Sequence, residues 1–250
     1  MMSTRRFLCL FALLLVSASL SARGGTLAGT TRHDTWLIQE SLERLSIGGT
    51  VDFQSRKVDL DQQGLRTLKA RVYSGYVGID LTEWLNVFGT LGQSEAALFS
   101  DDTYLDNKLK WSTGLQAGLW HFDVEDPTFL AGRLSINAMG EYSQYKSADS
   151  YEDISWREWF ASATVGYEIF VTKLADIERY PYSIAMYVGP AFSSLSGDDN
   201  NPIHNASFSQ DKSVGLAAGL DLFISHNLSA GGQLIYFDDT TYSVSLRYHF

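Results

Sequence analysis

The sequence is poor in cysteine and proline, and its one long apolar run lies at its start. The only cysteine, Cys9, falls within that run, too early for a lipoprotein cleavage site. Because we expect residues 1–22 to be removed, the mature chain has no cysteine with which to form a disulfide. The chain has four prolines and no later apolar stretch approaching about 18 residues. These absences exclude a helical membrane protein.

Residues 1–22 have the features of a secretory signal peptide. Arg5 and Arg6 precede an apolar stretch that is too short for a transmembrane helix. Small residues follow this stretch, and we expect cleavage after Ala18 or Ala22. The sequence therefore predicts export across the inner membrane.

Removal of the signal peptide leaves a more acidic chain. The full sequence has a net charge of -10, and the loss of two arginines and no acidic residue takes it to -12. Nucleic-acid binding needs a basic surface that neutralises phosphates, so we exclude nucleic acid as a partner. The 228 residues that follow residue 22 of 250 fit one domain. Their abundant glycine, together with tyrosine and phenylalanine, suits an all-β fold.

Apolar and polar residues alternate strictly at the C-terminus. Every second residue is apolar, namely Tyr242, Val244, Leu246, Tyr248 and Phe250. Such alternation indicates a β-strand with one apolar and one polar face. The pattern recurs from residue 46 onward and predicts about ten strands, with eight as the alternative. The expected strands span residues 46–57, 66–81, 84–98, 108–122, 129–146, 153–172, 181–195, 212–225, 228–238 and 241–250.

The connections between the expected strands alternate in character. Those after the even-numbered strands are short or compact, at 82–83, 123–128, 173–180 and 225–227. Those after the first, third, fifth and seventh strands are polar and acidic, and the longest spans 196–211, whereas the one after the ninth strand, at Asp238–Thr240, is unusually tight. Transmembrane β-barrels show this pattern, with short periplasmic turns, longer external loops and an even number of strands.

Alternation alone also fits a soluble β-sandwich, but strand length favours a barrel. A tilted strand needs about 9–11 residues to cross a bilayer, which the expected strands meet, whereas strands of globular proteins average about 5–6. Tyr182 and Phe192 flank one apolar face as interfacial girdle residues do. We therefore expect the apolar faces to contact lipid. The second expected strand fits less well, because Leu68 and Tyr73 belong to opposite faces that are both apolar, and we expect a β-bulge near Gly75.

Residues 34–45 have the apolar spacing of a short helix. We expect this helix to cover the periplasmic mouth of the barrel, with an interfacial anchor or a lumen plug as alternatives. The expected order is a signal peptide at 1–22, a periplasmic segment with the helix at 23–45, and a transmembrane barrel at 46–250.

If the apolar faces contact lipid, the charged residues between them line the lumen. We expect a structural charge network of Lys110, Arg133, Glu141, Glu158, Glu168, Asp221 and Arg247. Because side chains alternate between the two faces of a strand, we expect Asp52 and Arg56 to face inward as well. Positive and negative side chains at similar depths in the lumen favour internal ion pairs over a conducting path, because an unpaired buried charge is costly. We therefore expect a lumen filled mostly by side chains, while small residues such as Gly114 leave a narrow channel as the alternative.

We expect no catalytic, cofactor-binding or metal-binding residues. The most suggestive site is His226 with Ser225 and Ser229, because lipid A deacylases of the barrel type carry a histidine and a serine two residues apart. Here the following serine is three residues away and no glutamate comes after it. A lipid-modifying enzyme is therefore the least favoured function.

Two stretches resemble the outer-membrane protein β-barrel superfamily of the opacity-protein and OmpA-transmembrane type. They are the hairpin over Gly75–Gly92 and the closing segment from Gly219 to Phe250, which ends on an aromatic residue. The resemblance implies a location in the cell outer membrane. It also implies that the barrel assembly machinery reads the last strand, from Tyr242 to Phe250. Periplasmic chaperones, outer-membrane lipid and lipopolysaccharide are the other expected partners, with the oligomeric state left open.

Members of this superfamily are structural, adhesive or weakly pore-forming. We therefore expect a structural or surface-interaction role without catalysis. A narrow porin-like channel for small or apolar solutes is the alternative.

Overall fold

The computed structural model describes most of the chain after residue 44. The described residues are 45–61, 64–82, 84–98, 103–124, 131–170, 183–201, 205–225 and 227–250. The signal peptide and the helix expected over 34–45 lie outside them, apart from Leu45, which begins the first strand.

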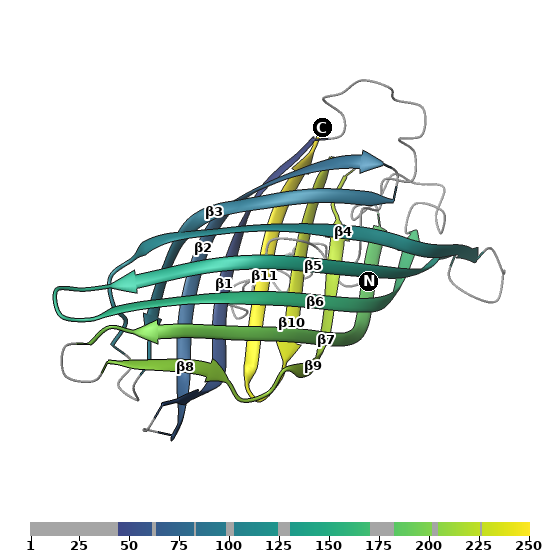
Figure 1. The fold of residues 1–250 in the computed structure, drawn as a ribbon. Coiled ribbons are helices and arrows are strands. Elements are labelled where there is room, and N and C mark those ends of the chain that lie inside the picture. The colour runs from purple at the N-terminus through teal and green to yellow at the C-terminus, as the bar shows by residue number, and fades with distance from the viewer. Residues whose placement is uncertain are drawn as a thin grey trace, which may run out of the picture.

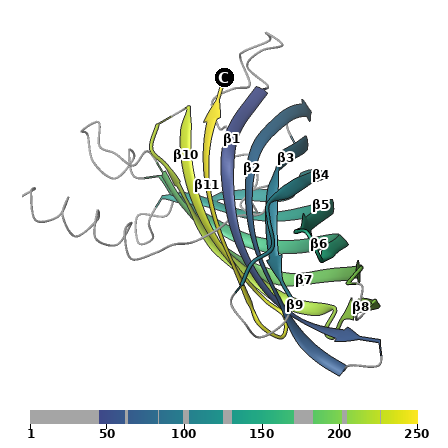
Figure 2. The same cartoon turned by 90° about the vertical axis from the view of Figure 1, so that its left-hand side faces the viewer.

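The fold is all-β, and ten of its strands form a closed antiparallel barrel, as the sequence predicts (Figure 1). The strands are β1 (Leu45–Leu60), β2 (Gly64–Thr82), β3 (Leu85–Ala97), β4 (Lys108–Val124), β5 (Gly132–Ala148), β6 (Asp153–Phe170), β7 (Ser183–Asp199), β8 (Ala206–Gln210), β9 (Val214–Phe223), β10 (Leu228–Tyr236) and β11 (Thr240–His249). β11 pairs with β1 and closes the ring, as Figure 2 shows. The described residues contain no helix that is long and apolar enough to cross a membrane.

The number of strands changes along the barrel axis. β9, β10 and β11 have 10, 9 and 10 residues, whereas β1 to β7 have 13 to 19. Beyond the short strands, β8 takes their place, pairing with β7 over Ser196–Asp199 and with β1 over Val58–Leu60. One end of the barrel, the eight-strand section, is therefore closed by β1 to β7 and β8. The other end, the ten-strand section, holds both β9 and the β10–β11 hairpin between β7 and β1.

β8 is the element that the sequence did not predict, since it lies in the connection expected over 196–211. It has 5 residues, of which Ala206 and Phe208 point inward and are buried. Its alternation is too short to be distinguished from a loop by pattern alone.

The two sections have opposite polarity, as β1 illustrates. In the ten-strand section Val51 points outward while Asp52 is buried inside. Further along the same strand Lys57 points outward while Val58 and Leu60 are buried inside. The outward face is therefore apolar in the ten-strand section and polar in the eight-strand section.

A ring of outward-facing aromatic residues marks the boundary between the two sections. This upper girdle consists of Phe53, Tyr73, Trp111, Tyr142, Trp159, Phe192, Tyr236 and Tyr242. Neighbouring rings touch where the strands bring them together, with ring centroids of Tyr142 and Trp159 at 4.7 Å and of Trp111 and Tyr142 at 5.6 Å.

Aromatic residues also lie at the opposite end of the ten-strand section. Trp120 stacks on Phe122 at 6.3 Å between centroids, and Tyr248 contacts Phe250 at 5.0 Å. On β6 the outward face runs from Trp159 to Ile169, ten residues apart. At about 3.3 Å per residue and a tilt of about 40°, that distance spans about 25 Å, the height of the apolar band of a membrane barrel.

The bulge expected near Gly75 is absent from β2, so that prediction is wrong. The pairing of β2 with β1 and with β3 is continuous through Gly75. Both faces of β2 are apolar because Leu68 and Val72 point into the apolar interior of the eight-strand section, while Val77 and Ile79 point outward in the ten-strand section.

Register shifts do occur at two other places. One lies between Asp80 and Thr82 at the end of β2, and the other between Gly118 and Trp120 on β4. The shift on β4 reverses the parity of the strand, so that Trp120 and Phe122 are exposed on the outward face.

Candidate functional site

The interior of the eight-strand section is a packed apolar core. This eight-strand core consists of Val58, Leu60, Leu68, Ala70, Val72, Ala96, Leu98, Leu105, Tyr145, Ile154, Trp156, Leu195, Ala206 and Phe208, all buried and in mutual contact. Strands β1, β2, β3, β5, β6, β7 and β8 all contribute to it. Tyr145 and Trp156 stack at 4.9 Å with an interplanar angle of 7°.

A buried ion pair lies where the strand number changes. The guanidinium of Arg56 is 3.5 Å from the carboxylate of Glu158, and both side chains are 1% exposed. Ser193 Oγ donates to Glu158 Oε1 at 2.6 Å, and Arg56 Nη2 donates to Gln210 Oε1 at 2.8 Å. The guanidinium carbon also lies 3.9 Å from the centroid of the Phe237 ring. These polar and aromatic contacts offset the cost of burying the two charges.

Gln210, the last residue of β8, fastens that strand to β7. Its side-chain oxygen accepts hydrogen bonds from Ser193 Oγ at 2.9 Å and from the Leu195 backbone N at 3.0 Å. Its side-chain nitrogen donates to the Ser193 carbonyl oxygen. No feature of the sequence indicated a role for Gln210 or Phe237. Their contacts with Arg56 form only because β8 and the β10–β11 hairpin meet at this point.

Six of the seven residues expected in the lumen charge network are buried. They are Lys110, Glu141, Glu158, Glu168, Asp221 and Arg247. The seventh, Arg133, is part-exposed and forms a bidentate pair with Asp123, with Nε to Oδ1 at 2.5 Å and Nη2 to Oδ2 at 3.1 Å. Arg133 lies opposite Glu168 in the register of β5 and β6, as the strand directions predict.

Hydroxyl groups and aromatic rings surround the members nearer the eight-strand section. Lys110 Nζ donates to Thr90 Oγ1 at 2.5 Å and to Ser112 Oγ at 3.2 Å, and it lies 5.7 Å from the ring centroid of Tyr145. Glu141 Oε1 accepts a hydrogen bond from Ser143 Oγ at 3.0 Å.

The members nearer the other end have similar surroundings. Glu168 Oε1 accepts from Ser183 Oγ at 2.5 Å. The guanidinium of Arg247 lies 4.6 Å from the ring centroid of Tyr76. Asp221 Oδ1 occupies the space that a Cβ atom on Gly231 would need, so the glycine makes room for the carboxylate.

Of the residues considered for lipid chemistry, the structure describes the two serines, which have different partners. Ser225 Oγ accepts hydrogen bonds from the backbone N of Asn227 at 3.3 Å and of Leu228 at 3.1 Å, which closes the β9–β10 turn. Ser229 Oγ lies 3.0 Å from Nε2 of His249 rather than pointing to that turn. His226 lies outside the described residues. Within the described ranges, no group of three or more His, Cys, Asp or Glu side chains is arranged to hold a metal ion.

The C-terminal residues complete the barrel. The His249 backbone N donates to the Asn227 carbonyl at 2.7 Å, and the Phe250 N donates to the Leu45 carbonyl at 2.9 Å. The apolar residues of the expected assembly signal, from Tyr242 to Phe250, all point outward and are partly or well exposed. Recognition of this strand by an assembly machinery stays a prediction.

No protein-family model and no curated protein matches the sequence. Solved structures do match. The crystal structure of outer membrane protease OmpT from Escherichia coli aligns with 87% of this chain and 100% of its own, at 11% identity and a TM-score of 0.42. The CymD monoaromatic hydrocarbon channel aligns with 93% of this chain and 95% of its own, at 10% identity and a TM-score of 0.27.

Proposed function

We propose that this chain is a bacterial outer-membrane β-barrel with a structural or surface-interaction role, without catalysis and without an open pore. The observation that carries the proposal is the eight-strand core, which packs apolar side chains across the interior of one end of the barrel.

The outward face of the ten-strand section supports the membrane location. It is apolar around the ring, is bounded by aromatic residues at both ends, and has the height of a bilayer core, about 25 Å. A soluble protein rarely exposes a continuous apolar surface of this size. The signal peptide expected at 1–22 and the aromatic C-terminus favour the outer membrane.

The eight-strand core supports a closed lumen. Ions and water that enter the polar lumen of the ten-strand section meet first the buried pair of Arg56 and Glu158 and then a packed apolar layer. An apolar constriction excludes water and so prevents ion passage. We expect the same layer to stabilise the eight-strand section outside the membrane, since it forms a core of the kind that a soluble domain has.

The outward face of the eight-strand section supports a role at the cell surface. Both ends of the barrel chain, Leu45 and Phe250, lie at the opposite end of the barrel. If that end is periplasmic, the eight-strand section projects outside the cell. It presents charged residues such as Lys57, Asp59 and Arg157 to solvent.

Planar-bilayer recordings of the purified, refolded protein test the proposal. We expect no stable openings, and steady conductance in the nanosiemens range would show an open pore and overturn the closed-lumen proposal. Heat-modifiable migration of the same sample on gels checks that the barrel is folded. A positive control replaces residues 205–211 with a flexible linker, which removes β8 and should produce conductance if the eight-strand core is the seal.

A further inference from the structure

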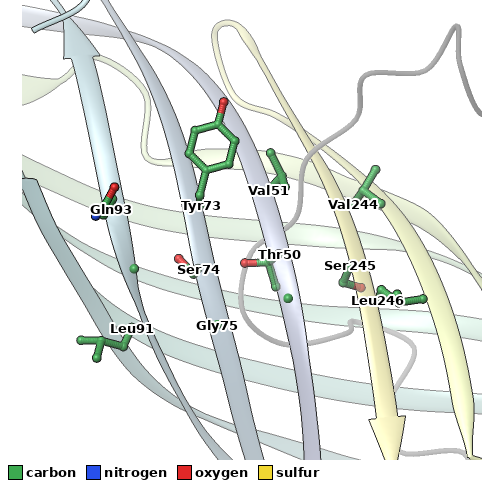
Figure 3. A pocket seen from close by; sticks show the side chains of 12 residues that line it. Thr50, Val51, Tyr73, Ser74, Gly75, Leu91, Gln93, Val244, Ser245 and Leu246 are labelled. Carbon is green, nitrogen blue, oxygen red and sulfur yellow. The ribbon is translucent and has the colours of Figure 1, made fainter. Parts of the chain in front are cut away.

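A groove lies on the outward face of β11, β1, β2 and β3, in the ten-strand section (Figure 3). It is lined mostly by apolar side chains, among them Val51, Tyr73 and Leu91. These side chains belong to the apolar surface that surrounds the whole ten-strand section, so we expect ordinary lipid chains to cover the groove. Nothing in its lining distinguishes it as the site of a particular ligand.

Asp199 is a buried acid at the end of the eight-strand section that lies away from the ten-strand section. It is the last residue of β7, faces inward and is 0% exposed. In the sheet register it lies between Ile154 of β6 and Ala206 of β8, which both belong to the eight-strand core. A carboxylate on the surface of an apolar core is costly unless its charge is compensated.

A second acid, Glu152, approaches Asp199 from the turn between β5 and β6. This turn and the end of β7 lie at the same end of the barrel (Figure 1). Burial raises the pKa of Glu152 most, followed by the charges of Asp199 and Asp149 and by hydrogen bonding with Asp199. Both charged groups that act on Glu152 are therefore acids. Two carboxylates form a hydrogen bond with each other only if one of them carries a proton, because ionised carboxylates only accept.

The other charged groups on the elements around Glu152 have contacts of their own. Lys146 of β5 lies 2.8 Å from the carboxylate of Asp153, at the start of β6, and both side chains are part-exposed or exposed. Asp198 of β7 points outward and accepts a hydrogen bond from a serine hydroxyl of β8 at 2.8 Å. Asp106, which precedes β4, is exposed and accepts a hydrogen bond from the Ala148 backbone N through its carbonyl oxygen. These groups leave the pairing of Glu152 to the acid at the end of β7.

We propose that Glu152 and Asp199 share one proton that fastens the β5–β6 turn to the end of β7, and that loss of this proton to solvent releases the turn. The two acids thus form a pH-sensitive latch. The latch is closed at low pH and opens as the pH rises, because a group with a raised pKa in the folded state stabilises that state only while it is protonated. In the orientation proposed above, this end of the barrel meets the pH outside the cell. The latch does not depend on whether the lumen is closed.

A nitroxide spin label on Tyr151→Cys tests the latch in the refolded barrel. Tyr151 lies in the turn and is 80% exposed, and we expect the mature chain to have no other cysteine. Electron paramagnetic resonance should show a mobile label at about pH 8 that becomes immobile towards about pH 4.5, with the ratio of the two forms changing about tenfold per pH unit near the midpoint. Asp149 does not contribute to this change, because its pKa is lowered from 3.8 and it stays ionised over the range.

Amide variants distinguish a shared proton from a general effect of pH. An amide offers both a donor and an acceptor at every pH, as the protonated acid does. In the labelled protein, Glu152→Gln and Asp199→Asn should therefore each keep the label immobile at every pH, whereas Glu152→Ala should leave it mobile at every pH. Asp198→Asn is the matched control, because it replaces the neighbouring outward carboxylate and keeps an acceptor for the serine hydroxyl. It should titrate as the wild type does.

Two results would overturn the latch. One is a label whose mobility does not change with pH in the wild type, and the other is an unchanged titration in Glu152→Gln. Immobilisation at high pH by calcium, with no effect of pH in the presence of a chelator, would replace the proton by a divalent cation. Heat-modifiable migration of every variant shows that the barrel is folded, and conductance is recorded separately, so failure of the latch is distinguishable from failure of the closed-lumen proposal.

Discussion

In the eight-strand section apolar side chains point inward and polar ones outward, as in a soluble β-barrel, whereas the ten-strand section has the reverse arrangement. Both sections share the strands β1 to β7, so one strand carries both patterns and exchanges them near the upper girdle. On β1 the exchange falls between Phe53, the last outward aromatic residue, and Val58, the first inward apolar residue beyond it. The comparison shows that the apolar face of a strand can change from one side of the sheet to the other along its length, while backbone pairing continues unchanged.

The largest effect is expected from a substitution that breaks the buried ion pair at the junction of the two sections. Replacing Glu158 by Leu leaves the guanidinium of Arg56 buried without this carboxylate, which should cost about 3–5 kcal/mol of folding free energy. The double variant Arg56→Met/Glu158→Leu should recover most of that loss, because it removes both charges. Urea titration of folding into liposomes measures the free energies.

A partly exposed pair is the matched control for this experiment. Arg71 and Glu95 lie 3.4 Å apart on the outward face, with side chains 42% and 19% exposed. Glu95→Leu should cost at most about 1 kcal/mol, because solvent screens the pair. Equal losses at the two pairs would show that the junction is hydrated rather than buried.

The second prediction compares two outward-facing positions on one strand, one in each section of the barrel. Val188 and Ser194 both point outward on β7, below and above the girdle residue Phe192. Val188→Arg should destabilise the barrel by about 2–4 kcal/mol, since it places a charge near the middle of the apolar band. Ser194→Arg should change the stability by no more than about 0.5 kcal/mol, since it lies on a polar surface. Similar values for both would contradict a membrane boundary at Phe192.

The third prediction compares the loss of one methylene group from the eight-strand core with the same loss from the outward face of the ten-strand section. Ile154 is buried in the eight-strand core, whereas Ile136 is 37% exposed on the outward face of β5. Ile154→Val should cost about 0.5–1.5 kcal/mol because it leaves a small cavity. Ile136→Val should cost less, because lipid chains fill the space that the methylene leaves. Chemical denaturation of both variants under the same conditions makes the comparison.

The sequence predicted the ten-strand barrel, because alternation sustained over segments longer than ten residues is typical of strands that cross a membrane. It also predicted inward positions for Lys110, Glu158 and Asp221, which follow from parity once the lipid-facing side is known. Parity could not reveal which side chains meet across the lumen, because this depends on the stagger of distant strands. The contacts of Arg56 with Glu158 and Gln210 are therefore a result of the structure.

The β2 strand shows where the inference from alternation failed. Apolar residues on both faces, such as Leu68 and Tyr73, suggested a change of parity, since a membrane barrel is expected to have a polar interior. The structure keeps the parity and changes the environment instead, because Leu68 belongs to the eight-strand core. A strand with two apolar faces that are offset along its length therefore indicates an apolar core inside one section of the barrel.

The smallest expected effect concerns the turn between β5 and β6, at the far end of the eight-strand section. Asp149 Oδ1 accepts hydrogen bonds from the backbone N of Tyr151 at 2.7 Å and of Glu152 at 2.8 Å, and these bonds lower the pKa of Asp149. Burial first, and then the neighbouring carboxylates of Asp199 and Asp149, raise the pKa of Glu152. Two carboxylates in one turn thus respond to pH in opposite directions.

The sign of each response follows from linkage. Glu152 has a raised pKa in the folded state, so its contribution to stability is present at low pH and is lost as the pH rises through that pKa. Asp149 has a lowered pKa, so its contribution is present at higher pH and is lost as the pH falls through it. Acidification from pH 7 should therefore first strengthen the turn and then weaken it. Hydrogen-exchange protection of residues 149–153, corrected for intrinsic rates, measures this, and Glu152→Gln should remove the initial rise because the glutamine does not titrate. A monotonic fall in protection in the wild type would contradict the opposed roles of the two carboxylates, and with them the close approach of Glu152 to Asp199 at the end of β7.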